Sequence, residues 1–325
     1  MPLTRDIGNP IVTRGDVPAV RGDLVDVTSV FNPGACVWRG RELLLLRVQT
    51  RGRGTVLVPA ERLADGSVRV EARVVEIEGL AETGVRVHHL YDPRLTVIGE
   101  AIYAVLAADL DDACRLVVAR SEDWARWSLV SMDRAGDRRN GVLFPEKIAG
   151  RFARLERPNR VTRTGGPASG SVITLAVSDD LAAWEDAGEV MSGRARLWDE
   201  LIGAGPPPVK TREGWLLIYH GVATHFASCN IYQAGVCLLD LEDPTKVVAR
   251  AGLNVLEPRE MWELVGQVPN VVFPSGMVVD GVDADGFAGA DCAVRVYYGA
   301  ADTVVGLAIS TVGELIADCR AGAGA

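Results

Sequence analysis

Short apolar runs bounded by turn residues recur along most of the chain, and five segments share one plan. Each segment has a proline, a short apolar run, a turn with glycine or charged residues, and a second apolar run. The prolines lie 52 to 66 residues apart, at Pro33, Pro93, Pro145, Pro208 and Pro274. Short strands at such a repeat length are typical of a β-propeller with four strands in each blade. The pattern predicts an all-β fold, a five-bladed β-propeller that residues 1–325 form as a single domain.

A second repeated pattern supports this prediction. Ser121 and Trp127 have the same spacing as Ser178 and Trp184, and acidic residues follow each serine. Signals for helices are few. We expect two helical turns in residues 194–201 and a short helix in residues 258–264, which begins with a proline suited to a first helical position. A β-sandwich built from coincidental strand pairs is the alternative interpretation of the same pattern.

The composition is that of an ordinary globular protein and excludes some partners. The 325 residues are 48% hydrophobic and carry a formal net charge of −9, which repels phosphate backbones and argues against nucleic acid as a partner. The apolar runs are shorter than the ~18 residues that span a membrane. The first residues lack the apolar region of a signal peptide, so we expect a cytoplasmic protein without a membrane partner. The six cysteines form no CxxC pair and are expected to be free thiols.

Polar residues beside the repeated prolines and at the ends of the second apolar runs are predicted to meet at the propeller axis, where the innermost strands converge. They are Asn32, Arg47, Asp92, Arg94, Glu146, Lys147, Arg157, Lys210, His220 and Asp302. The set mixes acids and bases without a His/Cys cluster, so we expect no metal site. His88 and His89 suit a structural role better than a metal site.

Asp92 is the candidate acid for cleavage of a glycosidic bond, a reaction that needs a proton donor for the leaving oxygen. It precedes Pro93, which favours an extended backbone, and its apolar neighbours Leu90 and Tyr91 would raise its pKa. From spacing alone, an Asp-Pro pair is more readily explained as a turn.

Three basic residues form the second candidate site. Arg139, Arg157 and Lys210 come from separate parts of the chain, and closure of the propeller would bring them together. Converging cations in an acidic protein indicate a site for phosphate or carboxylate. Each of them could also form an ordinary surface ion pair, an explanation that fits Lys210 least because it follows the stiff run Pro206–Val209.

Eight motifs carry a resemblance to a known family. They are Asn9–Thr13, Phe31–Ala35, Tyr91–Arg94, Leu143–Ile148, Ile202–Lys210, Gly214–Val222, Val268–Pro274 and Tyr298–Asp302. Together they resemble glycoside hydrolase family 130, the β-mannoside phosphorylases and related mannosidases. The resemblance runs along most of the chain, and the stretch from Gly205 to Val222 is its most specific part.

The resemblance implies a five-bladed propeller and an inverting phosphorolysis of short β-manno-oligosaccharides, with β-1,2 or β-1,4 linkages. Asp92 would protonate the glycosidic oxygen through the 3-hydroxyl group of mannose, and inorganic phosphate would attack to give α-mannose 1-phosphate. The residues implied for the mannosyl ring are Asn32, Arg47, Arg94 and Asp302. Those implied for phosphate are Arg139, Arg157 and Lys210, with His220 and Tyr232 at its edge. Phosphate would be a co-substrate, no further cofactor is expected, and members of the family often form homo-oligomers.

One departure from the family pattern leaves the attacking group open. Glu156 precedes Arg157 and Pro158, where many members have histidine. A carboxylate there would tune the phosphate site or activate water, as in the hydrolytic members. A β-mannosidase of the same fold is therefore the first alternative, and a non-catalytic sugar-binding propeller is the second.

Overall fold

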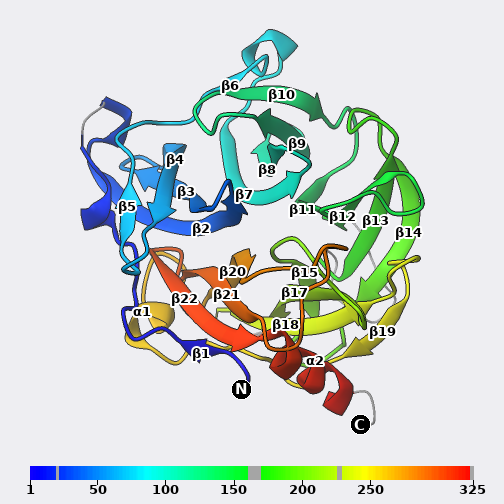
Figure 1. Cartoon of the computed structure of the whole chain (residues 1–325). Helices are drawn as coiled ribbons and strands as arrows, with labels where there is room; N and C mark the ends of the chain where they lie inside the picture. The colour runs from blue at the N-terminus through cyan, green and yellow to red at the C-terminus, as the bar shows by residue number, and fades with distance from the viewer. Residues whose placement is uncertain (20–21, 160–169, 225–228, 323–325) are drawn as a thin grey trace.

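Five β-sheets surround a central axis in the computed structural model, which describes residues 1–19, 22–159, 170–224 and 229–322 (Figure 1). The five-bladed propeller predicted from the repeat is confirmed. Each sheet is antiparallel apart from one short edge pairing, and its innermost strand faces the axis.

The five blades follow one another in chain order. Blade 1 contains β2 (Val27–Trp38), β3 (Arg41–Thr50), β4 (Thr55–Arg62) and β5 (Val68–Val70). Blade 2 contains β7 (His89–Ile98), β8 (Ala101–Asp109), β9 (Cys114–Ser121) and β10 (Trp127–Met132), with β6 (Ile77–Glu78) at its edge. Blade 3 contains β11 (Arg138–Leu143), β12 (Phe152–Pro158), β13 (Val172–Ser178) and β14 (Glu185–Ser192). Blade 4 contains β15 (Leu201–Ala204), β17 (Gly214–Ala223), β18 (Ile231–Leu239) and β19 (Val247–Arg250), and β16 (Val209–Thr211) pairs with β17. Blade 5 contains β20 (Val272–Val279), β21 (Ala293–Ala300), β22 (Val304–Thr311) and β1 (Thr4–Arg5).

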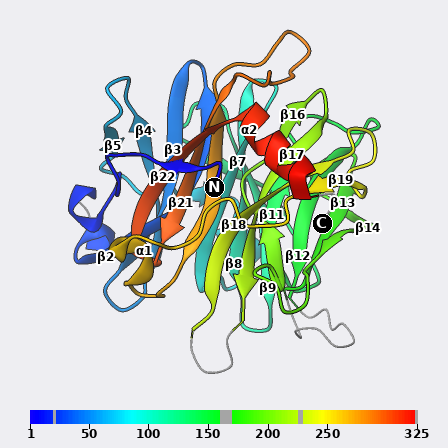
Figure 2. The ribbon, with the colours of Figure 1, turned by 90° about the horizontal axis from the view of Figure 1, so that it is seen from below.

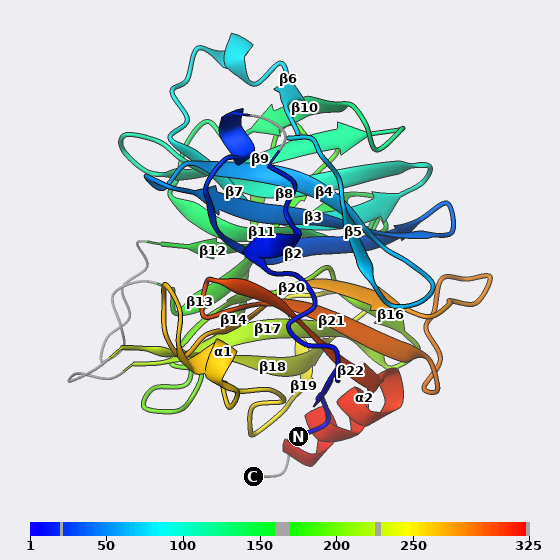
Figure 3. The same cartoon turned by 90° about the vertical axis from the view of Figure 1, so that its left-hand side faces the viewer.

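The N-terminal strand closes the ring, because β1 pairs with the outer strand β22 of the last blade. Arg5 adds a bidentate ion pair with the buried carboxylate of Glu263, at 2.7 and 2.8 Å. Figure 3 shows the N-terminal segment continuing from β22 towards β2, so the two ends of the repeat are held together.

The hydrophobic core is divided into clusters that lie between neighbouring blades. Large clusters join blades 1 and 2, blades 3 and 4, blades 4 and 5, and blades 5 and 1. The cluster between blades 2 and 3 is smaller, and includes Val105, Leu116 and Leu143. Burial of apolar surface between the blades is therefore the main stabilising term, with blades 2 and 3 sharing the least of it.

The repeated prolines do not occupy one structural position. Pro33, Pro93 and Pro274 lie within the innermost strands of blades 1, 2 and 5. Pro145 follows the end of β11, and Pro208 lies between β15 and β16. The repeat therefore gave the correct number of blades but the wrong alignment for blades 3 and 4.

The second repeated pattern is a shared turn between the third and fourth strands of blades 2 and 3. The hydroxyl group of Ser121 accepts from the backbone N–H of Trp124, and that of Ser178 accepts from Leu181, both at 2.9 Å.

The helices are short. They are η1 (Arg14–Asp16), η2 (Gly22–Leu24), η3 (Ala81–Thr83), α1 (Met261–Leu264) and α2 (Val312–Ala321). The helix expected in residues 258–264 is confirmed as α1, whereas residues 194–201 form turns and the start of β15, so that expectation was wrong. Helix α2 was missed, although Thr311 and Glu314 form a capping box at its start. Within the described ranges, no helix is long and apolar enough to cross a lipid bilayer.

Candidate active site

The innermost strands of blades 1, 2 and 3 carry the same irregularity near the axis. In each strand, two residues lie opposite one residue of the neighbouring strand, which makes a β-bulge. The first residue of each bulge is Asn32, Asp92 or Asn140, with φ of 45°, 52° and 52°. Positive φ is uncommon outside glycine and is most accessible to Asn and Asp, so the residue types fit the backbone. The bulges place three polar side chains at equivalent positions of successive blades.

The carboxylate of Asp92 is held by two donors from blade 1. Its Oδ1 accepts from Asn32 Nδ2 at 2.9 Å and from Arg47 Nη1 at 2.8 Å. Among the described residues, Oδ2 has no hydrogen-bond partner. Burial favours the protonated form, but the nearby guanidinium groups and the amide of Asn32 outweigh burial, and the pKa of Asp92 lies below its ordinary value. One oxygen of Asp92 is thus fixed while the other can face a substrate.

Arg94 supports the bulge that carries Asp92. It is fully buried, and its guanidinium group donates to the carbonyl oxygens of Asp92 at 2.8 Å and of Gly205 at 2.9 Å. Burial lowers the pKa of Arg94 to about 10, although the negative charge of Asp92 opposes this effect. Arg94 therefore joins blade 2 to blade 4 beneath Asp92 and adds positive charge to the site.

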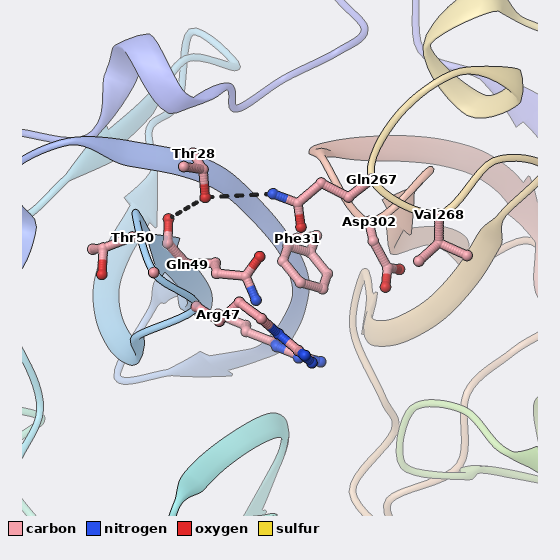
Figure 4. A pocket seen from close by; sticks show the side chains of 10 residues that line it. Thr28, Phe31, Arg47, Gln49, Thr50, Gln267, Val268 and Asp302 are labelled. Carbon is pink, nitrogen blue, oxygen red and sulfur yellow. Dashed lines mark hydrogen bonds between the residues drawn. The ribbon is translucent and has the colours of Figure 1, made fainter.

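A cavity of about 390 Å³ is bordered by Arg47, the arginine that binds the carboxylate of Asp92. Figure 4 shows Arg47, Gln49 and Phe31 on one side of the cavity and Asp302 and Val268 on the other. Burial raises the pKa of Asp302 to about 6, with the negative charge of Asp92 adding to the effect and Arg47 opposing it. The cavity thus offers one carboxylate, guanidinium groups, side-chain amides and an aromatic ring, which are groups that bind sugars.

Arg139 and Arg157 are directly opposite each other on neighbouring strands, β11 and β12. Like charges at opposite positions of an antiparallel pair destabilise a sheet unless an anion lies near them. Burial lowers the pKa of Arg157, and the positive charge of Arg139 lowers it further. In the described part of the chain, no carboxylate forms an ion pair with Arg157, while Arg139 has one contact of 3.4 Å with Asp109. The pair therefore forms a concentrated positive site that the protein itself leaves largely unneutralised.

His220 and Tyr232 lie on blade 4 close to this pair. Their ring centroids are 6.3 Å apart, and the ring of Phe273 lies 4.6 Å from that of His220. His220 is fully buried, and burial together with nearby arginines holds its pKa well below the usual value, so the ring is neutral. Neither ring nitrogen has a hydrogen-bond partner among the described residues. A neutral imidazole with an available N–H suits contact with an oxygen-rich ligand.

Tyr91 lies between Arg47, which borders the first cavity, and Arg139, which borders a second, more polar cavity. The second cavity, of about 640 Å³, is bordered by Arg139 and Arg157. The guanidinium carbon of Arg47 lies 4.6 Å from the centre of the Tyr91 ring, and that of Arg139 lies 6.0 Å from it. The first cavity lies beside the strands of blade 1, near the bulge of Asn32, and the second lies at the ends of the strands that carry the bulges of Asp92 and Asn140. The channel face therefore has two cavities, one bordered by Arg47 and Asp302 and the other by Arg139 and Arg157.

The structure does not bring Lys210 into this cluster, and its expected convergence with the arginines was wrong. Lys210 pairs with Trp215 at the start of β17, whereas His220 lies five residues further along, about 16 Å away at the rise of a strand. Its ammonium group forms an ion pair of 2.7 Å with Glu146. Figure 2 shows β16 near the rim from which the segment between β20 and β21 projects.

Glu146 and Lys147 are also absent from the channel. Both follow the end of β11; Glu146 binds Lys210, and the ammonium group of Lys147 lies 4.4 Å from the ring of Phe152. These placements have one cause: Pro145 and Pro208 lie beyond the inner strands, so their neighbours are not axial.

Glu156 does not face the phosphate candidates. Its carboxylate accepts from Arg154 at 2.5 and 2.8 Å and forms an ion pair of 2.8 Å with Arg138. Successive side chains of a strand point to opposite faces, so Glu156 and Arg157 point away from each other. The departure from the family pattern at this position therefore places no carboxylate beside Arg157 to activate water.

Asn140 was overlooked in the sequence. Its side chain is buried, and its Oδ1 has no hydrogen-bond partner among the described residues. A Cβ on Gly203 would lie 2.8 Å from this oxygen and 2.4 Å from His220 Cε1, so only glycine allows both side chains to lie here. The Asn140-Gly141 pair was the available signal, because Asn before Gly favours positive φ.

His89 borders the polar cavity, and the described residues contain no group of His, Cys, Asp and Glu suited to a metal.

Comparison with known proteins identifies the family and a solved structure of the same fold. The sequence profile of a family described as beta-1,4-mannooligosaccharide phosphorylase matches residues 4–321. A 1,2-beta-oligomannan phosphorylase of Thermoanaerobacter sp. (strain X514) is 36% identical over 234 residues, which cover 70% of each chain. A beta-1,4-mannooligosaccharide phosphorylase of Ruminococcus albus is 35% identical over 230 residues, covering 70% of this chain and 64% of the relative. The solved complex of a beta-1,2-mannobiose phosphorylase from Listeria innocua with beta-1,2-mannobiose has the same fold, with a TM-score of 0.83, 23% identity, and coverage of 99% of this chain and 100% of that chain.

Proposed function

The chain belongs to glycoside hydrolase family 130, and from that membership and the channel geometry we propose that it cleaves β-mannosides by phosphorolysis, releasing α-mannose 1-phosphate. The observation that carries the proposal is the pair Arg139 and Arg157, which lie directly opposite each other with no carboxylate of the described residues paired to Arg157. Water needs no such pair of cations, whereas a phosphate ion does.

In this mechanism, the mannosyl ring occupies the cavity bordered by Arg47 and Asp302, beside the free oxygen of Asp92. Phosphate binds between Arg139 and Arg157, where its negative charges offset the repulsion between the two guanidinium groups. Both ligands are then bound and oriented before the reaction begins, which lowers the entropic part of the barrier.

The bond changes follow from this placement. Asp92 supplies the proton that the leaving glycosidic oxygen needs, through the 3-hydroxyl group of the mannose, as the family resemblance implies. A phosphate oxygen forms a bond to the anomeric carbon from the face opposite the leaving group, so the β-linkage becomes an α-phosphate. No general base is required, because phosphate is already a nucleophile.

The lowered pKa of Asp92 has a consequence for the order of events. In the free protein, Arg47 and Arg94 favour the ionised carboxylate, which cannot donate a proton. Phosphate brought to the neighbouring arginines adds negative charge to the site and raises the pKa of Asp92. Binding of phosphate therefore prepares the acid as well as supplying the nucleophile.

The experiment is an incubation of β-1,2- and β-1,4-mannobiose with the purified protein, with and without inorganic phosphate, followed by identification of the products by ³¹P NMR and chromatography. We expect mannose 1-phosphate in the α configuration, formed only when phosphate is present. Asp92→Asn should lower the rate by about 10²–10⁴-fold, the usual contribution of an acid group. Free mannose formed without phosphate would instead show a mannosidase, and binding without turnover would show a sugar-binding protein.

A further inference from the structure

The two arginines of the anion site are held in place by different chemical groups. Arg139 donates to the carboxylate of Asp109 at 3.4 Å, and this carboxylate also accepts from the hydroxyl group of Tyr91 at 2.8 Å. Arg157 donates instead to the neutral side-chain oxygen of Asn159, at 3.1 Å. The more deeply buried of the two arginines therefore has an uncharged partner.

Asp137 fixes the orientation of Asn159. The Nδ2 group of Asn159 donates to Asp137 Oδ1 at 2.8 Å, and its backbone N–H donates to the carbonyl oxygen of Asp137 at 2.9 Å. An ionised carboxylate only accepts hydrogen bonds, so the amide nitrogen of Asn159 must face Asp137. The carbonyl oxygen of the same amide is then left to face Arg157.

Arg154, on the other face of β12, shows what charged partners do to an arginine in this blade. It binds the carboxylates of Glu156 and Asp133 at 2.5 to 3.0 Å, and it is almost completely buried. Its charge is neutralised by the protein and is not available to an anion from solution.

We propose that Asn159 is a positioning residue, which holds Arg157 ready for phosphate without neutralising its charge. Asp137 supplies the orientation, and the amide of Asn159 separates the negative charge of Asp137 from the guanidinium group. A carboxylate at position 159 would compete with phosphate for Arg157. This inference rests on the proposed phosphorolysis, because it assigns phosphate as the anion.

The test exchanges the acid and the amide. The double variant Asp137→Asn with Asn159→Asp keeps one amide and one carboxylate at hydrogen-bond distance but moves the negative charge next to Arg157. We expect the KM for phosphate to rise by about 10- to 100-fold, the scale of a charged hydrogen bond, while the KM for mannobiose changes little. The rate at saturating phosphate should stay close to that of the unaltered protein.

Two single variants serve as controls. Asp137→Asn leaves Arg157 with an amide partner, so its KM for phosphate should rise less than about threefold. Asn159→Ala removes the hydrogen bond without adding charge, so its effect should lie between that of Asp137→Asn and that of the exchange. Thermal unfolding of each variant shows whether the fold is retained.

A KM for phosphate that is unchanged in the double variant would overturn the inference, and so would equal increases in the two KM values, which indicate a purely structural role. The unaltered protein separates this failure from failure of the proposed function, because its own phosphate dependence tests the latter. If it shows no phosphorolysis, calorimetric titration of inorganic phosphate into both proteins decides the inference: equal affinity rejects it, and weaker binding by the double variant supports it.

Discussion

Arg154 and Arg157 lie three residues apart on β12, on opposite faces of one strand, and their surroundings differ. Arg154 is bound by Asp133, which follows the outer strand of blade 2, and by Glu156 of its own strand. Arg157 faces the channel, where another arginine lies opposite it on β11 and its hydrogen-bond partner is the neutral Asn159. Arg154 is almost completely buried, whereas Arg157 is partly exposed and borders the polar cavity.

The difference distinguishes an arginine whose charge the protein neutralises from one whose charge remains available to an anion. The network around Arg154 lies where the apolar cluster between blades is smallest, and it fills that interface with paired charges. The pair Arg139 and Arg157 is compensated only by the contact of Arg139 with Asp109, so the remaining electrostatic repulsion is one that an anion would relieve. Perturbed and uncompensated charges of this kind mark functional sites more often than structural ones.

The largest expected effect is a loss of stability when Arg154 is replaced. Arg154→Met would leave the carboxylates of Glu156 and Asp133 without their shared partner in a buried place. Removing one member of a buried ion network typically costs 3–5 kcal/mol, and we expect a loss of about that size in the free energy of unfolding. Urea denaturation measures it. A loss below about 1 kcal/mol would show that the two faces do not differ in this way.

The matching change on the channel face should affect binding rather than stability. Arg157→Met removes one of two repelling cations, so unfolding without phosphate should occur at the same temperature as in the unaltered protein, or higher. The KM for phosphate should rise by about 100-fold, equivalent to ~2.7 kcal/mol. Arg157→Lys is the matched control, because it keeps the charge but loses the second donor. Its KM for phosphate should lie between those of the unaltered protein and Arg157→Met. Destabilisation as large as that of Arg154→Met would contradict the distinction.

The stability of the protein should change in opposite directions when Asp302 and Glu156 are each replaced by the neutral amide. Because the pKa of Asp302 is raised to about 6, the folded protein binds its proton more tightly than the unfolded chain does. Stability is therefore lost as the pH rises from about 4 to 6, and Asp302→Asn avoids this loss. We expect Asp302→Asn to be more stable by about 1–3 kcal/mol above pH 6, with no difference below about pH 4.

Glu156→Gln is the comparison for that variant, because the carboxylate of Glu156 is paired with Arg154 and Arg138. It should be less stable by about 1–3 kcal/mol at neutral pH, and its products from mannobiose should be unchanged. Denaturation curves at several pH values measure both variants. Loss of a hydrolytic activity in Glu156→Gln would restore the mannosidase alternative.

The smallest effect is expected from Lys210, which lies at the other end of blade 4 and pairs with Glu146. Lys210→Ala should change the KM for phosphate by less than about twofold, because an exposed ion pair far from the channel contributes little. Steady-state kinetics with varied phosphate provides the measurement. A tenfold increase would place Lys210 in the phosphate site after all.

The fold and the place of Asp92 in an inner strand could be predicted from the sequence because both depend on local patterns. Alternating apolar runs and turns at a repeated spacing specify strands and blade number, and Asp92 stands next to a proline that does lie in an inner strand. Proline also suits strand ends and loops, so Pro208 carried no information about the axis. Lys210 was misplaced for that reason.

The remaining parts of the site depend on register, which the sequence does not show directly. That Arg139 lies opposite Arg157 follows from the pairing of β11 with β12 and from the bulge between them. The bulge also brings Asn140 to the axis, through a positive φ that only the neighbouring glycine hinted at. In the sequence Glu156 is adjacent to Arg157, but side chains alternate along β12, so the two residues point to opposite faces.

The most direct test of the central claim is a crystal structure with arsenate, an analogue of phosphate whose arsenic atom gives an anomalous signal. The account predicts an anomalous peak between the guanidinium groups of Arg139 and Arg157, beside His220 and Tyr232. A peak at Lys210, or no peak at a concentration of arsenate that supports turnover, would contradict it.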